Sequence, residues 1–223
     1  GETLPQDSEA DNKYRRAAAY LVGWLAEGVL TEDTPPAIYI HDHYFTYRGK
    51  ERRRRGIACR VRLEEWARMV VRPHEGTLSA PKGDRIRLLS VLGANTSPVF
   101  SMYQDKSGEV AAVLARAATG RPVASVPPLD GERHELFAIT DPQEIARLQS
   151  LFADKPLYIA DGHHRYESAL TYQREHRALN PDAPEDAPFN FVLMTLADMD
   201  DPGLLILPPH RLLRGLPPAK LAE

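Results

Sequence analysis

The sequence predicts an α+β fold, with mixed α/β character, in which short mixed sheets pack against helices. Roughly seven short apolar runs resemble strands and about five segments have helical spacing, but the two types do not alternate strictly. With 223 residues and 43% hydrophobic content, the chain can bury a sizeable core. We expect residues 1–140 and 141–223 to form two portions, with a single domain as the alternative, and the abrupt start suggests a fragment of a longer protein.

Charge and composition restrict the classes of function. The chain has 28 Lys+Arg and 31 Asp+Glu, so its net charge of −3 offers no general attraction for nucleic acid or an anionic membrane. A single cysteine, Cys59, excludes an internal disulfide, and no apolar run approaches the ~20 residues of a membrane span. These observations favour a cytoplasmic protein without a nucleic-acid or membrane partner, and they leave its oligomeric state open.

The chain is expected to begin with a helix and a β-hairpin. Residues 14–27 place apolar side chains at helical spacing, and Gly28 supplies a stop, so we expect a helix that packs by its aromatic side. Residues 38–45 are β-branched and aromatic, and residues 57–63 alternate apolar with polar. A turn at residues 47–50 would join these two strands into a hairpin.

Three features of this hairpin carry candidate chemistry. His41 and His43 alternate on a strand and therefore share one face, but without a third ligand nearby in sequence they are a weak metal signal. The arginines at residues 52–55 are expected in a solvated turn rather than against nucleic acid, because no aromatic residues are interleaved with them. Cys59 falls on the apolar face of its strand, which favours a core residue over a nucleophile.

Residues 72–85 are dense in polar, turn-forming and cationic side chains and form a second candidate site. Ser79 is a plausible N-cap of the helical pattern that follows, so Lys82 and Arg85 would flank a helix N-terminus. The alternative is an irregular loop whose charges serve only solubility.

The rest of the chain continues as short strands and helices. A Pro-rich linker at residues 180–188 is expected on the surface. The expected strands are residues 98–103, 123–126, 135–139, 157–160, 189–196 and 204–207, and the expected helices are residues 109–119, a segment starting at Asp141-Pro142, and a segment that runs from Tyr166 through Arg174.

The strongest chemical candidate is the turn at residues 161–165, between a short buried strand and a helix. Backbone N–H groups at a helix start gather partial positive charge, and Arg165 adds a permanent cation, so an anion such as phosphate would bind there. Gly162 permits close approach of a ligand, and Asp161 can cap the helix or orient a histidine. His163 and His164 are adjacent and would diverge by roughly 100° on a helix, which favours phosphate or substrate contacts over joint metal ligation.

A third candidate is the acidic turn at residues 198–203. Asp198, Asp200 and Asp201 carry carboxylates that could ligate a hard cation such as Mg²⁺, and Asp200 and Asp201 are the preferred ligands. Acidic residues are also common in ordinary turns before Pro-Gly, and this is the alternative.

Several motifs resemble a known family. In chain order they are residues 72–77, 81–85, 94–98, 160–167 and 199–204. Together they resemble a prokaryotic family known only as "domain of unknown function 1015". More distantly, residues 161–165 after a strand are similar to the phosphate-binding turn of the ParB/sulfiredoxin-like superfamily, which includes free-serine kinases. This second resemblance implies a nucleotide, ATP or ADP, whose phosphates rest on the turn, with either transfer to a small hydroxyl substrate or nucleotide-controlled clamping on DNA.

The leading hypothesis is a phosphotransferase that acts on a small molecule. The amides from Gly162 onward, with Arg165 and the two histidines of the turn, would hold the donor phosphates. Lys82 and Arg85 would neutralise the transferred group, and Mg²⁺, if needed, would bind the acidic turn. Glu75 is the candidate base, with His74 as its substitute, and His164 is a further catalytic candidate.

Two other classes of function remain as alternatives. The first is a non-catalytic, nucleotide-dependent switch that controls binding to DNA or to another protein. The second is a metal-dependent hydrolase that uses His41, His43 and the acidic turn.

Overall fold

The computed structural model describes residues 2–76, 79–207 and 214, without the side chains of residues 79–82 and 129. Two short 3₁₀ helices, η1 (Trp66–Arg68) and η2 (Pro188–Asn190), accompany the main elements. In chain order the main elements of the described part are α1 (Lys13–Ala26), β1 (Ile38–Tyr47), β2 (Lys50–Arg62), β3 (Val71–Arg72), α2 (Ser79–Leu92), β4 (Val99–Tyr103), α3 (Glu109–Ala117), β5 (Ala124–Leu129), β6 (Glu132–Ile139), α4 (Pro142–Phe152), β7 (Leu157–Asp161), α5 (His163–Leu179) and β8 (Phe191–Asp198).

The eight strands form one mixed sheet in the order β3-β7-β4-β8-β2-β1-β6-β5. Two pairs, β3 with β7 and β4 with β8, are parallel, and the other neighbours are antiparallel. The predicted α+β class is therefore confirmed, but a single sheet replaces the several short sheets expected. Strands β7 and β8 come late in the chain and lie among strands of the first portion, so the sheet interleaves the two halves of the sequence.

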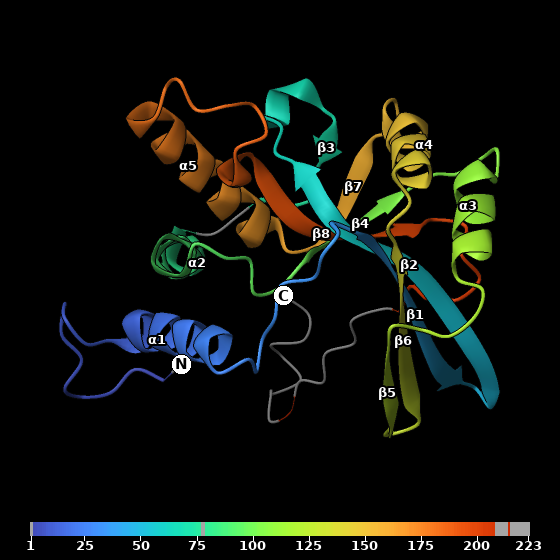
Figure 1. The fold of residues 1–223 in the computed structure, drawn as a ribbon, viewed down its shortest axis with the longest axis horizontal. Helices are drawn as coiled ribbons and strands as arrows, with labels where there is room; N and C mark the ends of the chain where they lie inside the picture. Colours follow the sequence, from blue (N-terminus) through green and yellow to red (C-terminus); the bar gives the residue numbers. More distant parts are fainter. Residues whose placement is uncertain (1, 77–78, 208–213, 215–223) are drawn as a thin grey trace.

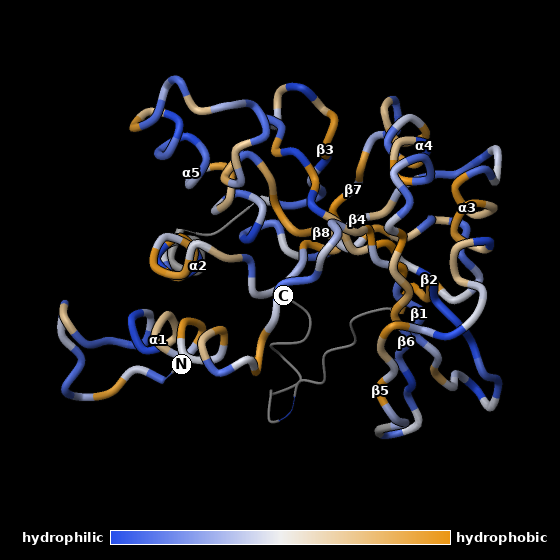
Figure 2. Tube along the Cα trace, viewed as in Figure 1, coloured by the Kyte–Doolittle hydropathy of each residue, from blue (hydrophilic) through white to orange (hydrophobic). Residues whose placement is uncertain are grey.

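Helices cover the sheet in two groups. Helices α3 and α4 lie together on one side, whereas α1, α2 and α5 lie on the other (Figure 1). Strand β4 shows the alternation expected of a half-buried strand, with Val99, Ser101 and Tyr103 buried. The Tyr103 ring meets Phe152 of α4 edge-on, with the ring centroids 4.7 Å apart. Apolar residues are concentrated along β7 and β8 at the centre of the molecule (Figure 2).

Helix α1 forms where expected, but its predicted packing is wrong. None of its residues is buried, and Tyr20 and Trp24 are 63% and 45% exposed. Its attachment is polar instead, because Asp84 of α2 accepts hydrogen bonds from Lys13 at 2.6 Å and Tyr14 at 2.7 Å.

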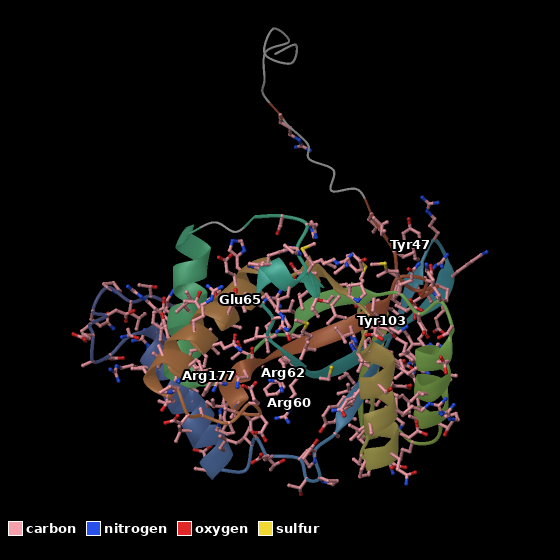
Figure 3. The ribbon with its side chains drawn as sticks, turned by 90° about the horizontal axis from the view of Figure 1, so that it is seen from above. Tyr47, Arg60, Arg62, Glu65, Tyr103 and Arg177 are labelled. Carbon is pink, nitrogen blue, oxygen red and sulfur yellow. The ribbon has the colours of Figure 1, made fainter. Side chains whose placement is uncertain are left out.

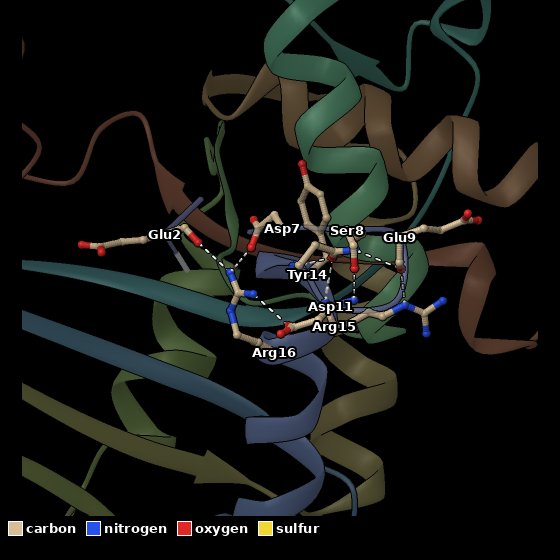
Figure 4. Close-up of polar contacts among 9 residues, drawn as sticks. Glu2, Asp7, Ser8, Glu9, Asp11, Tyr14, Arg15 and Arg16 are labelled. Atoms are coloured by element: carbon tan, nitrogen blue, oxygen red, sulfur yellow. Dashed lines mark hydrogen bonds and ion pairs between the residues drawn. The ribbon is translucent and has the colours of Figure 1, made fainter. Parts of the chain in front are cut away.

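The segment before α1 is held to the helix by its own polar contacts. Arg16 binds Asp7 and Asp11 at 2.8 Å each and the Glu2 carbonyl at 3.0 Å (Figure 4). Asn12 caps the helix by accepting the backbone N–H of Tyr14.

Two further expectations are wrong. The arginines at residues 52–55 lie within β2 rather than in a solvated turn, because β1 and β2 pair as far as Tyr47 and Lys50. Residues 204–207 do not form a strand: Ile206 is 88% exposed, and Leu204 instead closes a turn by donating to the Asp201 carbonyl. An apolar run forms a strand only where a neighbouring strand satisfies its backbone groups.

Asp42 and Arg55 form a buried ion pair in the sheet. Asp42 of β1 is fully buried, and its two carboxylate oxygens accept hydrogen bonds from the Arg55 guanidinium at 2.7 and 2.5 Å. Arg55 also donates to the Leu114 carbonyl of α3 at 3.3 Å, so this face of β1 and β2 points toward α3. Among the described residues, no helix combines the length and apolarity needed to cross a bilayer.

Replacing Asp42 with alanine should be strongly destabilising. The Arg55 side chain is only 11% exposed and would keep a buried charge without its partner, a situation that typically costs about 3–5 kcal/mol. Chemical denaturation of Asp42→Ala measures this loss. The matched control is Glu65→Ala, which breaks the exposed ion pair with Arg174 and should cost at most about 1 kcal/mol. Equal losses in the two variants would contradict the structural role of the buried pair.

Candidate functional site

The turn at residues 161–165 has the geometry expected of a strand-to-helix connection. Strand β7 ends at Asp161, and α5 begins at His163. Between them Gly162 has a φ of 98°, a left-handed conformation that other residues adopt only with strain. A Cβ atom on Gly162 would also lie 2.9 Å from Arg165 Nε. Glycine therefore serves both the backbone conformation and the close packing of the arginine.

Arg165 is held in place by three protein groups. Its guanidinium donates to Ser97 Oγ at 2.9 Å, to the carbonyl of Pro98 and to the carboxylate of Asp161. Of the two roles considered for Asp161, capping α5 is not the one it takes, because the N-cap residue is Gly162. The Asp161 side chain is 73% exposed, so an incoming anion could replace it as a partner of Arg165.

The distant residues His74 and Glu75 lie against this turn. His163 is almost completely buried, and its Nε2 accepts the backbone N–H of His74 at 3.3 Å. The His74 ring meets the His163 ring edge-on at 4.5 Å and donates from Nδ1 to the Ile159 carbonyl at 2.7 Å. The first residues after β3 are thereby fixed to both the end of β7 and the start of α5.

Glu75 stands next to the buried histidine. Its Oε1 lies 3.0 Å from His163 Nδ1, yet the two atoms are not aligned for a hydrogen bond, and Nδ1 has no hydrogen-bond partner among the described residues. Since Nε2 accepts a hydrogen bond, the pattern assigns the ring proton to Nδ1, facing the carboxylate. The Glu75 side chain is 57% exposed, so one end of it is available to a ligand.

Burial and, secondarily, the neighbouring His74 lower the pKa of His163, while Glu75 and Asp161 act in the opposite direction. The ring is therefore uncharged at neutral pH. It positions Glu75 by its dipole and packing rather than by a full charge.

Tyr166 connects the start of α5 to the segment that leads into β3. It is fully buried, and its hydroxyl accepts the Glu64 N–H at 2.9 Å and donates to the Glu64 carbonyl at 2.8 Å. Its ring packs on Trp66 with the centroids 4.7 Å apart. Burial raises the pKa of Tyr166 to about 12, so the hydroxyl keeps the proton that it donates.

A groove and a larger cavity lie beside the turn. The groove is lined by residues of α2, of α5 and of the loop before β4, and it brings Arg85 and Arg165 together with Ser97. The cavity, of about 420 Å³, has an aromatic wall formed by Tyr172, Phe189 and Phe191. Both are lined by Leu89, Ala94 and Asn95, so they are adjacent.

Positive charge also surrounds the aromatic wall. Arg60 and Arg62 stack on Phe191, with their guanidinium carbons 4.6 and 5.2 Å from the ring centroid. Arg177 stacks on Phe189 at 5.2 Å. Figure 3 shows Arg60 and Arg62 near the middle of the molecule and Arg177 farther from Tyr103.

The sequence also predicts site roles for His164, Lys82 and the acidic turn. His164 is partly exposed at the start of α5, and the side chain of Lys82 lies outside the described residues. The acidic turn is distant: β7 pairs Asp161 with Phe100 at one end of β4, whereas Asp198 pairs with Tyr103 at the other end. Asp200 and Asp201 are therefore not brought to the turn.

The acidic turn packs on β2 instead. Asp201 accepts the backbone N–H of Gly203 at 2.7 Å and that of Arg55 at 3.3 Å. A Cβ on Gly203 would clash with the Arg53 carbonyl oxygen, so the loop and the strand are in close contact.

Sequence reasoning missed Ser97 and Tyr166 as residues that organise the site. Both fall within family-like motifs, residues 94–98 and 160–167, but the sequence pattern alone predicts no partner for either side chain. The buried hydroxyl of Tyr166 is the clearer signal, because such a group requires a polar partner. Cys59 packs against the core as predicted, and burial raises the pKa of its thiol to about 12.

Gly162→Ala should destabilise the protein and displace Arg165. A left-handed alanine costs about 1–3 kcal/mol, and the contact with the guanidinium adds to that cost. Gly120→Ala is the matched control, since its φ is 94° but nothing lies within 4 Å of the added Cβ. Urea denaturation of both variants should show the larger loss for Gly162→Ala, and equal losses would exclude a role for the close packing.

Stability should also depend on the protonation of His163. Its pKa is below the ordinary 6.5 in the folded protein, so the unfolded chain binds the proton more readily as the pH falls below about 6.5. The free energy of unfolding should therefore decrease from pH 7 to pH 5, and less steeply in His163→Gln, which cannot be protonated. Parallel pH profiles for the two proteins would contradict this assignment.

A family model described as "Protein of unknown function (DUF1015)" matches residues 1–223, the whole chain. No curated protein matches the chain. No solved structure matches it either.

Proposed function

Because the chain belongs to this family of unknown function, its activity has to come from the site, and we propose that it is a small-molecule phosphotransferase with a nucleotide, ATP or ADP, as donor. The donor phosphates bind at the N-terminus of α5, and the acceptor is a small molecule with a hydroxyl group. The observation that carries the proposal is the contact of Glu75 with His163, which sets a carboxylate beside an anion-binding turn.

Phosphate binding rests on the charges around the turn. The first amides of a helix and its dipole favour an anion, and Arg165 adds a guanidinium fixed by Ser97 and Pro98. Arg85 lines the same groove, so two cations can neutralise the donor. A protein that catalyses phosphoryl transfer acts mainly by positioning the reactants and neutralising their charge.

Glu75 acts as the general base. Its carboxylate takes the proton of the acceptor hydroxyl while the hydroxyl oxygen forms a bond to the transferred phosphorus. The bond from that phosphorus to the nucleotide oxygen breaks, and its electron pair leaves on the nucleotide. The uncharged ring of His163 holds Glu75, and His74 fixes His163 through its backbone N–H.

The cavity next to the groove has the size and lining for the organic part of a ligand. A cavity of about 420 Å³ falls within the range of small-molecule sites, and its aromatic wall can stack on a planar group. We assign the nucleoside to this cavity and the phosphates to the groove. Asp200 and Asp201 have no part in this arrangement, since they lie at the opposite end of β4.

Nucleotide binding and phosphoryl transfer test the proposal separately. Calorimetric titration with ATP and ADP should show that Arg165→Ala weakens binding by roughly 10- to 100-fold, which corresponds to the loss of a charged hydrogen bond. Arg174→Ala is the control, because Arg174 lies on the same helix but pairs with the exposed Glu65. Unchanged affinity in Arg165→Ala would remove the turn from the nucleotide site.

The second measurement follows transfer of labelled phosphate to a panel of small hydroxyl compounds. Glu75→Gln should retain nucleotide binding but lose about 10²- to 10⁴-fold in transfer rate, as expected for a general base. Binding without transfer in the wild-type protein would instead identify a nucleotide-dependent switch. Full activity in Glu75→Gln would exclude Glu75 as the base.

A further inference from the structure

A cluster of histidines lies on strands β1 and β6, away from the turn. His41 and His43 share one face of β1, as predicted, and their rings are parallel with the centroids 6.4 Å apart. Asp42 between them points toward α3 through Arg55, so the histidines face the opposite side of the sheet. Three strands, β4, β8 and β2, separate this cluster from β7.

The structure supplies the third ligand that the local sequence lacked. His134 of β6 is paired with His43 in the strand register, and the rings stack with centroids 4.4 Å apart. Glu132, two residues earlier on β6, places its Oε2 at 2.9 Å from His43 Nε2. One nitrogen of each of these two histidines and one Glu132 oxygen all lie within 4.8 Å of one another.

We propose that His43, His134 and Glu132 bind a divalent transition-metal ion of the zinc type. Two imidazoles and one carboxylate are a ligand set that zinc uses with its fourth position open to water or a substrate. Antiparallel pairing of β1 with β6 presents the three groups without rearrangement of the backbone. The side chain of His43 is 14% exposed and that of Glu132 52% exposed, so an ion can reach the site from solvent.

His41 is the positioning residue of this site. Its Nε2 lies 2.9 Å from His134 Nδ1, and this contact leaves Nε2 of His134 to face the ion. Metal-bound histidines commonly engage their second ring nitrogen in this way.

Arg54 competes with the ion. Its Nη2 lies 3.3 Å from His43 Nδ1, and its guanidinium carbon lies 5.4 Å from the centroid of Phe100. When Nε2 of His43 ligates a metal, Nδ1 carries the ring proton and can no longer accept from Arg54. The arginine must then turn away, so its removal should strengthen metal binding.

Calorimetric titration of the metal-free full chain with zinc chloride tests the site. We expect one bound ion, and affinity at least 100-fold lower in His43→Ala and in His134→Ala. Glu132→Gln should also weaken binding, and His41→Ala should weaken it by about 10- to 100-fold, the usual effect of a positioning partner. Arg54→Ala should bind more tightly than the wild type.

The controls separate this site from the His74–His163 pair and from loss of folding. His74 and His163 form, with Glu75, another group of possible metal ligands, so His74→Ala should leave zinc affinity unchanged. Thermal unfolding without metal checks that each variant is folded, and zinc should raise the melting temperature of the wild type more than that of Glu132→Gln. Absence of stoichiometric zinc binding, or binding lost in His74→Ala but kept in His43→Ala, would overturn the proposal.

Discussion

The candidate site depends on one buried hydroxyl, that of Tyr166. By exchanging two hydrogen bonds with the backbone of Glu64, it fixes the start of α5 to the segment that enters β3. Strand β3 then pairs with β7, and the chain emerges at His74 directly against His163. Because Tyr166 is fully buried, its hydroxyl needs a protein partner, and the backbone of Glu64 supplies both an N–H and a carbonyl.

Two buried ionisable groups illustrate how the fold accommodates charge: one has a partner of opposite charge, and the other is uncharged. Asp42 is neutralised by Arg55, whereas His163 is kept uncharged by burial. Arg165 of the turn and Arg85 of α2 instead line the same groove. The buried ion pair therefore lies toward α3, whereas the two arginines of the groove lie on the α5 side of the sheet.

Local features of the site were predictable from the sequence, whereas its long-range contacts were not. A short apolar run followed by glycine and a helical pattern predicts a strand-to-helix turn, and the structure has this turn between β7 and α5. The contact between Glu75 and His163 depends on the pairing of β3 with β7, two short strands whose partners no local pattern specifies. The same limit applies to His134, since its pairing with His43 is set by strand register. The prediction of a strand at residues 204–207 fails for the same reason. The apolar pattern is typical of a strand, but the segment has no neighbouring strand to pair with and is irregular.

The parallel pairing of β3 with β7 also determines when the site can form during synthesis. Val71 pairs with Leu157, and the intervening chain contributes α2, α3, α4 and three other strands. Closing so long a loop has an entropic cost, which is offset only when β3 and β7 have paired. A growing chain therefore carries Glu75 long before it carries the partner that positions it. Glu75 and the turn at residues 161–165 therefore come together only after α5 has been synthesised and has packed.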